Sequence, residues 1–179
     1  MQTLDLTTAL ARLLTDARLR EEFRKAPERT ADSLHVSSAD RASFCELDAE
    51  ALEFQAQGLI FKRFHEVLKW LPQTLCCLEG RGKTHFLKYA NTYWPKGHRR
   101  HQLDALEFCR YLLEQRICGV NTFEFHWLQF QSDDKKVELH FFHDIPMRKR
   151  LRRGWIMFYR TLYQRPAWRS LVMLPSFQK

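Results

Sequence analysis

Apolar residues recur at helical spacing along the first 131 residues of the chain, in which Leu, Ala, Glu and Arg are frequent. Side chains three and four positions apart lie on one face of a helix, so the pattern predicts a series of amphipathic helices. We expect the longest one between a cap at Asp48 and Pro72, because a proline ends or kinks a helix. Its apolar stripe consists of Ala56, Ile60, Phe64, Val67 and Leu71.

Shorter helices are expected on both sides of this long one. Asp16 can cap a helix over residues 17–25, and Pro27 suits the first turn of the helix that follows. Further helical patterns cover residues 6–14, 40–44, 73–78 and 83–93.

A central helix is expected over residues 103–117, after a break at Pro95 and Gly97. Apolar side chains recur there on two neighbouring faces, so the helix should be packed on two sides in the middle of a core. The two faces consist of Leu106, Cys109, Leu113 and Ile117 and of Ala105, Phe108 and Leu112.

The loop at the head of this central helix is crowded with aromatic and basic side chains. A solvated turn requires fewer of them, so we expect the loop to contact a partner protein. The alternative is a locally packed tryptophan among solvated charges. The candidate interface residues are Trp94, His98, Arg99, Arg100 and His101.

The stretch over residues 120–131 fits two patterns. Phe123, Trp127 and Phe130 lie at helical spacing, whereas Phe123, Phe125 and Trp127 alternate as in a strand. We predict a helix, because the helical stripe includes more of the apolar residues.

The pattern changes after residue 131, where short alternating runs separated by turns replace the helical spacing. Such alternation over residues 137–142 is typical of a strand, and residues 154–162 and 168–174 are further strand candidates. We therefore predict an α+β protein. A helical domain should cover residues 1–131, and a small antiparallel β-sheet domain should cover residues 132–179.

The net charge of +8 indicates an acidic partner, which could be a nucleic acid, an anionic membrane, or an acidic protein or peptide. From Asp144 onward the sequence contains one acidic residue and nine lysines and arginines. A small open sheet also has unpaired edges, which must be covered or take in a strand from a partner. The tail is therefore the candidate binding region.

The location of the protein is predicted from what the sequence lacks. No stretch approaches the roughly 18 apolar residues of a transmembrane helix, and the N-terminus has no secretory pattern. Five cysteines without paired spacing suit reduced thiols, so we expect a cytoplasmic protein without membrane contact.

The histidines and cysteines show no pattern of a catalytic or metal site. No pair of cysteines has zinc spacing, and no nucleophile signature accompanies any of them. Cys109 lies on an apolar stripe and is expected in the core. We predict no catalytic residue and no metal ligand in this chain.

Three segments resemble the partner subunits of multinuclear-iron peptide-modifying oxidases. The length and the aromatic, basic tail are most similar to the MbnC-type branch of that group, which acts in methanobactin biosynthesis. The three segments are Leu13-Leu14-x-Asp16-x-x-Leu19-Arg20-x-x-Phe23, the long helix with Lys62-Arg63 and Leu71-Pro72, and Trp94-Pro95 followed by His101-x-x-Asp104-Ala105-Leu106-x-Phe108.

This resemblance implies a heterodimer with an MbnB-like TIM-barrel oxidase, which would hold the iron; no cofactor is expected in this chain. The pair would use dioxygen to convert cysteines of an MbnA-like precursor peptide into oxazolone and thioamide groups. This chain would bind the leader of the precursor through its C-terminal sheet. The candidate leader-binding residues are Val137, Leu139, Phe141, Arg148, Arg150, Arg152, Arg153, Trp155 and Phe158.

Two other functions stay open at this point. A basic nucleic-acid-binding protein would explain the net charge and the cluster Arg148–Arg153, although the sequence contains no recognisable binding module. A free-standing enzyme would have to use His98, His101 or Cys109. We favour the peptide-binding subunit over both.

Overall fold

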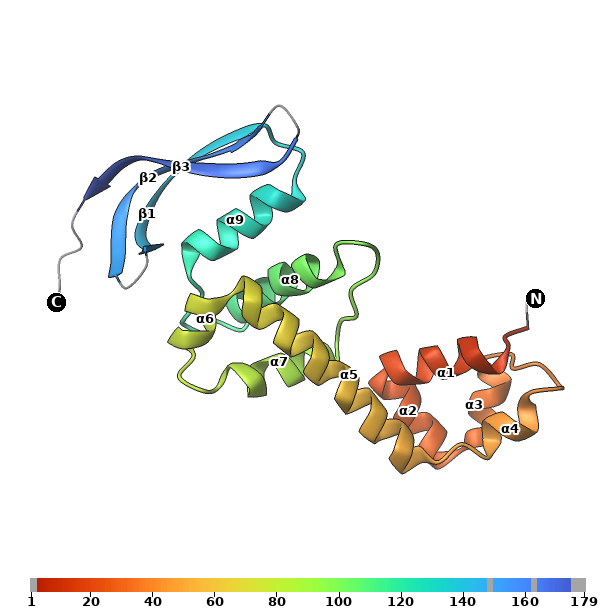
Figure 1. Ribbon diagram of the computed structural model, residues 1–179. Coiled ribbons are helices and arrows are strands. Elements are labelled where there is room, and N and C mark those ends of the chain that lie inside the picture. The colour runs from red at the N-terminus through yellow and green to blue at the C-terminus, as the bar shows by residue number, and fades with distance from the viewer. Residues whose placement is uncertain (1–2, 148–149, 162–163, 175–179) are drawn as a thin grey trace. The chain divides into compact units, whose positions relative to one another are not determined.

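The structure is a computed structural model that describes residues 3–147, 150–161 and 164–174. In these residues, nine helices precede a three-stranded antiparallel sheet (Figure 1). The α+β class predicted from the sequence is confirmed.

The chain forms two compact units. The first comprises Met1–Arg63 with Ala90–Trp94, and the second comprises Phe64–Tyr89 with Pro95–Lys179. The boundary predicted at residues 131 and 132 falls inside the second unit.

The helices of the first unit begin where short polar side chains can cap them. Asp16 Oδ1 accepts hydrogen bonds from the backbone N–H groups of Arg18, at 2.9 Å, and Leu19, at 3.1 Å. Asp48 Oδ1 likewise accepts one from the N–H of Glu50, so both predicted caps are confirmed. The unit contains α1 (Leu6–Thr15), α2 (Ala17–Lys25), α3 (Pro27–Ser33), α4 (Arg41–Cys45) and the first part of α5 (Ala49–Trp70).

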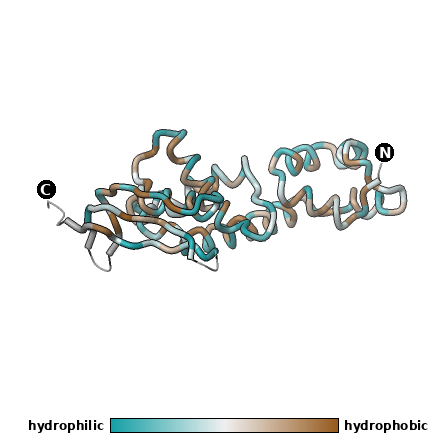
Figure 2. The backbone as a smooth tube through the Cα atoms, turned by 90° about the horizontal axis from the view of Figure 1, so that it is seen from above, coloured by the Kyte–Doolittle hydropathy of each residue, from teal (hydrophilic) through white to brown (hydrophobic). Residues whose placement is uncertain are grey.

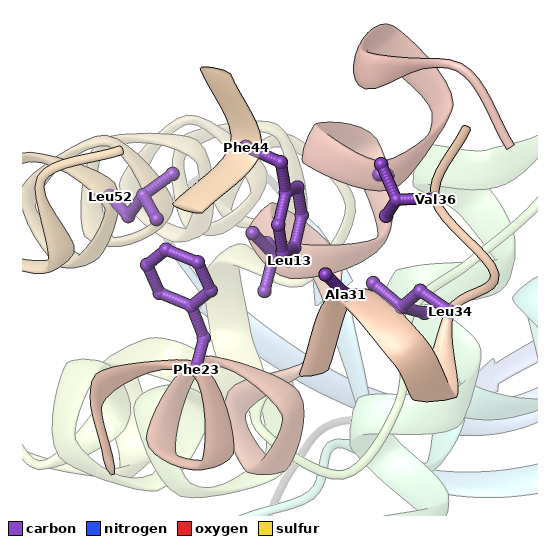
Figure 3. Packing of buried hydrophobic residues seen from close by; sticks show 8 residues of the cluster. Leu13, Phe23, Ala31, Leu34, Val36, Phe44 and Leu52 are labelled. Carbon is purple, nitrogen blue, oxygen red and sulfur yellow. The ribbon is translucent and has the colours of Figure 1, made fainter. Parts of the chain in front are cut away.

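The first unit has its own hydrophobic core, in which side chains from all five of these helices point toward one another (Figure 3). Phe23 and Phe44 meet edge to face, with their ring centroids 5.2 Å apart. Arg20 is buried beside this core, where it donates to Glu53 at 2.8 Å and to the carbonyl of Leu13 at 3.1 Å. Its charge is therefore paired despite the burial.

The second unit begins with the end of α5 and continues with shorter helices. The prediction that a helix would run to residue 93 is wrong, because it ends at Ala90. The Arg63 guanidinium donates to the carbonyls of Ala90, at 3.5 Å, and Tyr93, at 3.0 Å, which holds this segment outside the helix. These helices are α6 (Pro72–Cys77), α7 (Gly82–Ala90), α8 (Arg100–Glu114) and α9 (Thr122–Ser132).

Helix α8 is the central helix predicted from the sequence, and both of its predicted faces are buried along most of its length. Leu106 and Phe108 are almost fully buried, and Phe108 packs against Phe86 at a centroid distance of 5.2 Å. Leu113 was predicted to be buried and is not: it lies in the last turn of α8, where the helix face is uncovered, and is 49% exposed.

The sheet consists of β1 (Val137–Met147), β2 (Arg150–Arg160) and β3 (Pro166–Leu174), in the order β1-β2-β3. Helix α9 lies against one face, which we call the inner face (Figure 1). The helix predicted over residues 120–131 is thereby confirmed over Thr122–Ser132. Apolar segments recur along the strands (Figure 2). The core of α9 and the sheet contains Phe123, Phe130, Phe142, Ile145, Ile156 and Phe158, with Trp127 partly buried beside it.

Replacing Leu106 by Ala should lower the free energy of unfolding by about 2–5 kcal/mol, because the substitution leaves a cavity at a buried site. The half-exposed Leu113 on the same helix gives a matched control, and Leu113→Ala should cost roughly 0.5 kcal/mol. Urea denaturation measures both changes. Equal losses for the two variants would contradict the position of the core.

Candidate functional site

The face of the sheet opposite α9, which we call the outer face, carries large apolar side chains that the chain leaves exposed. Pairing places Leu139 opposite Met157 and Phe141 opposite Trp155, and the last two rings meet at 5.4 Å. The register therefore brings four of the predicted leader-binding residues to one surface: Val137 is 60% exposed, Leu139 52%, Phe141 37% and Trp155 43%.

Phe158 does not belong to this surface, so its assignment to leader binding is corrected. Residues alternate along β2, so Phe158 points to the inner face, where it is fully buried against Phe130 and Trp127. It supports the sheet and cannot touch a ligand on the outer face.

The arginines predicted to bind the leader do not all lie on the same face of the sheet. Arg153 lies two residues before Trp155 and therefore on the outer face, whereas Arg152 pairs with the buried Ile145 on the inner side. Arg150 begins β2, and nothing further is described of its side chain. Arg148 lies outside the described residues.

One arginine of the tail has a structural role that the sequence did not reveal. Arg160, at the end of β2, donates to the carbonyls of Lys135, at 3.0 Å, and Phe130, at 3.1 Å, and also to that of Asp133. Its guanidinium also lies over the Phe130 ring at 5.3 Å. Arg160 thus ties the end of α9 to the sheet.

The position of α9 depends on a buried polar cluster at its first turn. The Glu124 carboxylate accepts hydrogen bonds from the N–H groups of Gln73, at 2.7 Å, and Thr74, at 2.9 Å, and caps α6. In the opposite direction, the N–H of Asn121 donates to the Thr74 hydroxyl at 3.0 Å, and the Asn121 side chain caps α9 by accepting from the N–H of Glu124.

The polar cluster was not predicted, although the sequence contains a signal of it. Asn121 and Glu124 have the spacing of a capping box, in which the acidic side chain normally turns back to its own cap residue. Here the carboxylate reaches another helix, some fifty residues earlier in the chain.

Two histidine rings stack between α9 and β1. The centroids of His126 and His140 are 4.5 Å apart, and His140 Nε2 lies 3.3 Å from a Glu138 oxygen. Burial lowers the pKa of His126, and the charge of a protonated His140 lowers it further. Of the other neighbours, Glu138 raises this pKa and Lys135 lowers it. The pair therefore favours an uncharged His126.

The residues predicted at the head of the central helix fall in both compact units. Trp94 belongs to the first, where the Arg63 guanidinium lies 4.5 Å from its ring centroid. In the second unit, Arg99 donates to the carbonyl of Gln131 at 3.2 Å, and His98 and Arg100 are exposed. His101 is half-buried, and its Nε2 lies 3.4 Å from the Nε of Arg100.

The described residues offer no grouping of three His, Cys, Asp or Glu side chains that could hold a metal ion. Burial raises the pKa of the Cys109 thiol, and the Glu124 carboxylate raises it further, so this thiol resists ionisation. Among the described helices, none is long and apolar enough to cross a membrane.

No family model, curated protein or solved structure matches this chain.

The free energy of unfolding should fall as the pH is lowered from about 7 to about 5.5. The pKa of His126 is lowered in the folded state, whereas in the unfolded chain the same histidine has a pKa of about 6.5. As the pH falls, His126 is therefore protonated first in the unfolded chain, which stabilises the unfolded state relative to the folded one. Urea denaturation at a series of pH values measures the effect. His126→Gln should flatten this part of the curve, and the same change at the exposed His143 should leave it unaltered.

Proposed function

We propose that this chain is the partner subunit of an iron-dependent peptide-modifying oxidase of the MbnB type, and that it binds the leader of an MbnA-like precursor peptide. The observation that carries the proposal is a small antiparallel sheet with long edge strands and a basic surface. The three segments that resemble partner subunits of multinuclear-iron peptide-modifying oxidases support the same conclusion, and the length and the basic, aromatic tail are similar to the MbnC-type branch.

An edge strand of this sheet suits an added peptide strand. In the described residues no other strand pairs with the free edges of β1 and β3. An extended leader can donate to and accept from these backbone groups, which sets its register, while alternate side chains contact the surface beside the edge. Backbone pairing would thus supply most of the affinity.

The charges favour an acidic leader at the β3 edge. Arg165 and Arg169 are exposed there, and the strand contains no acidic residue, whereas β1 contains Glu138. Each exposed ion pair contributes only about 0.2–1 kcal/mol, so the arginines would adjust the affinity and speed the encounter.

The division of labour places the oxidation chemistry in the barrel subunit. Burial and the raised pKa of its thiol make Cys109 a poor nucleophile, and the proposal assigns the iron to the barrel subunit. The chain would therefore contribute binding and positioning of the precursor, and the partner the iron.

The first test uses the full-length chain with an MbnB-like barrel protein and a cysteine-containing MbnA-like precursor, which would be sought among the genes that neighbour its own. We expect stable copurification, iron only in fractions that contain the barrel protein, and dioxygen consumption only when all three are present. Stoichiometric iron in the isolated chain, or full activity of the barrel protein alone, would contradict the proposal.

The mode of leader binding can be tested without changing the protein. Two synthetic leaders should differ in affinity when one is N-methylated at the odd and the other at the even residues. In one leader the methyl groups replace the N–H groups that would pair with the edge strand, and in the other they replace the N–H groups that point away from it. Binding measured by calorimetry should be lost for one leader only. Loss for both would indicate a helical leader, and loss for neither would exclude strand addition.

A second prediction concerns the head of α8 as a contact with the barrel subunit. Arg99→Ala combined with Arg100→Ala should weaken the complex, whereas the melting temperature should change little because exposed charges stabilise the fold only slightly. Lys88→Ala with Arg110→Ala removes the same charge from other exposed positions and is the matched control. Pull-down at physiological salt measures both; equal retention by the two variants would exclude this interface.

A further inference from the structure

Strand addition at an edge leaves the outer face of the sheet uncovered. Antiparallel sheets commonly bury one face and present polar side chains on the other. Here the inner face is covered by α9, yet the outer face presents Leu139, Phe141 and Trp155, and Leu171 of β3 is also 51% exposed. A contiguous exposed apolar surface of this kind marks a contact with another molecule.

The inner face shows what kind of element fits such a surface. Helix α9, which is eleven residues long, lies along this side of the sheet (Figure 1). Its aromatic side chains Phe123 and Phe130 pack into the core that it forms with the strands. The outer face belongs to the same three strands, and its apolar residues also run across them, from Leu139 through Met157 to the stem of Arg169. A second amphipathic helix would match it, giving a sheet between two helices.

The charges around the apolar centre restrict the helix further. Arg153 and Arg169 occupy outer-face positions, and no described residue of that face is acidic. A cationic rim selects a helix that bears carboxylates beside its apolar stripe. It also disfavours a second copy of the chain, because two such rims would repel each other and the net charge is +8.

We propose that the outer face of the sheet binds an acidic amphipathic helix of a partner protein. This contact uses the side chains of the outer face, whereas leader addition uses backbone groups of an edge, and Arg169 would lie beside both partners.

The test uses the full-length chain and a fluorescent synthetic peptide of about 18 residues, a length that permits a helix once bound. The peptide carries Leu and Phe at i, i+3, i+4 and i+7 spacing and Glu beside them. Fluorescence anisotropy should show saturable binding, and circular dichroism should show the peptide gaining helix. A peptide with Lys in place of Glu, and one of the same composition with the spacing scrambled, should bind about tenfold or more weakly.

Two leucines of similar exposure make a matched pair of variants. Leu139→Ser alters the outer face, whereas Leu113→Ser alters the end of α8, and the two side chains are 52% and 49% exposed. Leu139→Ser should weaken binding of the acidic peptide about tenfold, and Leu113→Ser should leave it unchanged. Arg169→Glu, which keeps the apolar centre, should weaken the acidic peptide and improve the Lys peptide.

Equal binding of the acidic and Lys peptides, or equal affinity of the two leucine variants, would overturn the proposal. So would two other occupants of the same face. Binding to vesicles of phosphatidylcholine and phosphatidylglycerol that is lost in Leu139→Ser would assign the face to a membrane. Dimerisation in sedimentation velocity that is lost in the same variant would assign it to a second copy.

Discussion

The second unit depends on one buried carboxylate. Glu124 is 5% exposed and accepts hydrogen bonds from the N–H groups of Gln73 and Thr74 and from the Thr74 hydroxyl. Removing a charge from water is costly unless several donors satisfy it, and the free N–H groups at the start of α6 meet that need. The same contact holds the first turn of α9 against α6. Because α9 then forms the inner core of the sheet, the position of the strands follows from this interaction.

Helix α9 consequently connects two kinds of structure. Its first turn takes part in the polar cluster with Asn121 and Thr74, while Phe123 and Phe130 pack on the strands and Arg160 ties its last turn to the end of β2. An isolated three-stranded sheet buries little apolar surface, so it needs such a helix for stability. One helix can cover only one face, and large apolar side chains on the other face stay exposed.

The basic residues of the tail are not equivalent once the strands are paired. Arg160 is occupied by backbone carbonyls, whereas Arg169 is exposed on the outer face beside Met157. A count of positive charges would treat the two alike and would suggest a general affinity for polyanions. Their positions instead divide the charge between an arginine that holds the sheet to α9 and an arginine that is exposed on the outer face.

The sequence by itself determined most of the local structure. The caps at Asp16 and Asp48, the buried face of α8 and the alternation in β1 follow from interactions within a few residues, which the order of residues reveals directly. Only the tertiary structure decided which face of the sheet α9 covers, since both faces of β1 and β2 are apolar enough to be core. It also decided the opposite fates of Phe158 and Trp155, and the partnership of Glu124 with α6, because these contacts join residues that are distant in the chain.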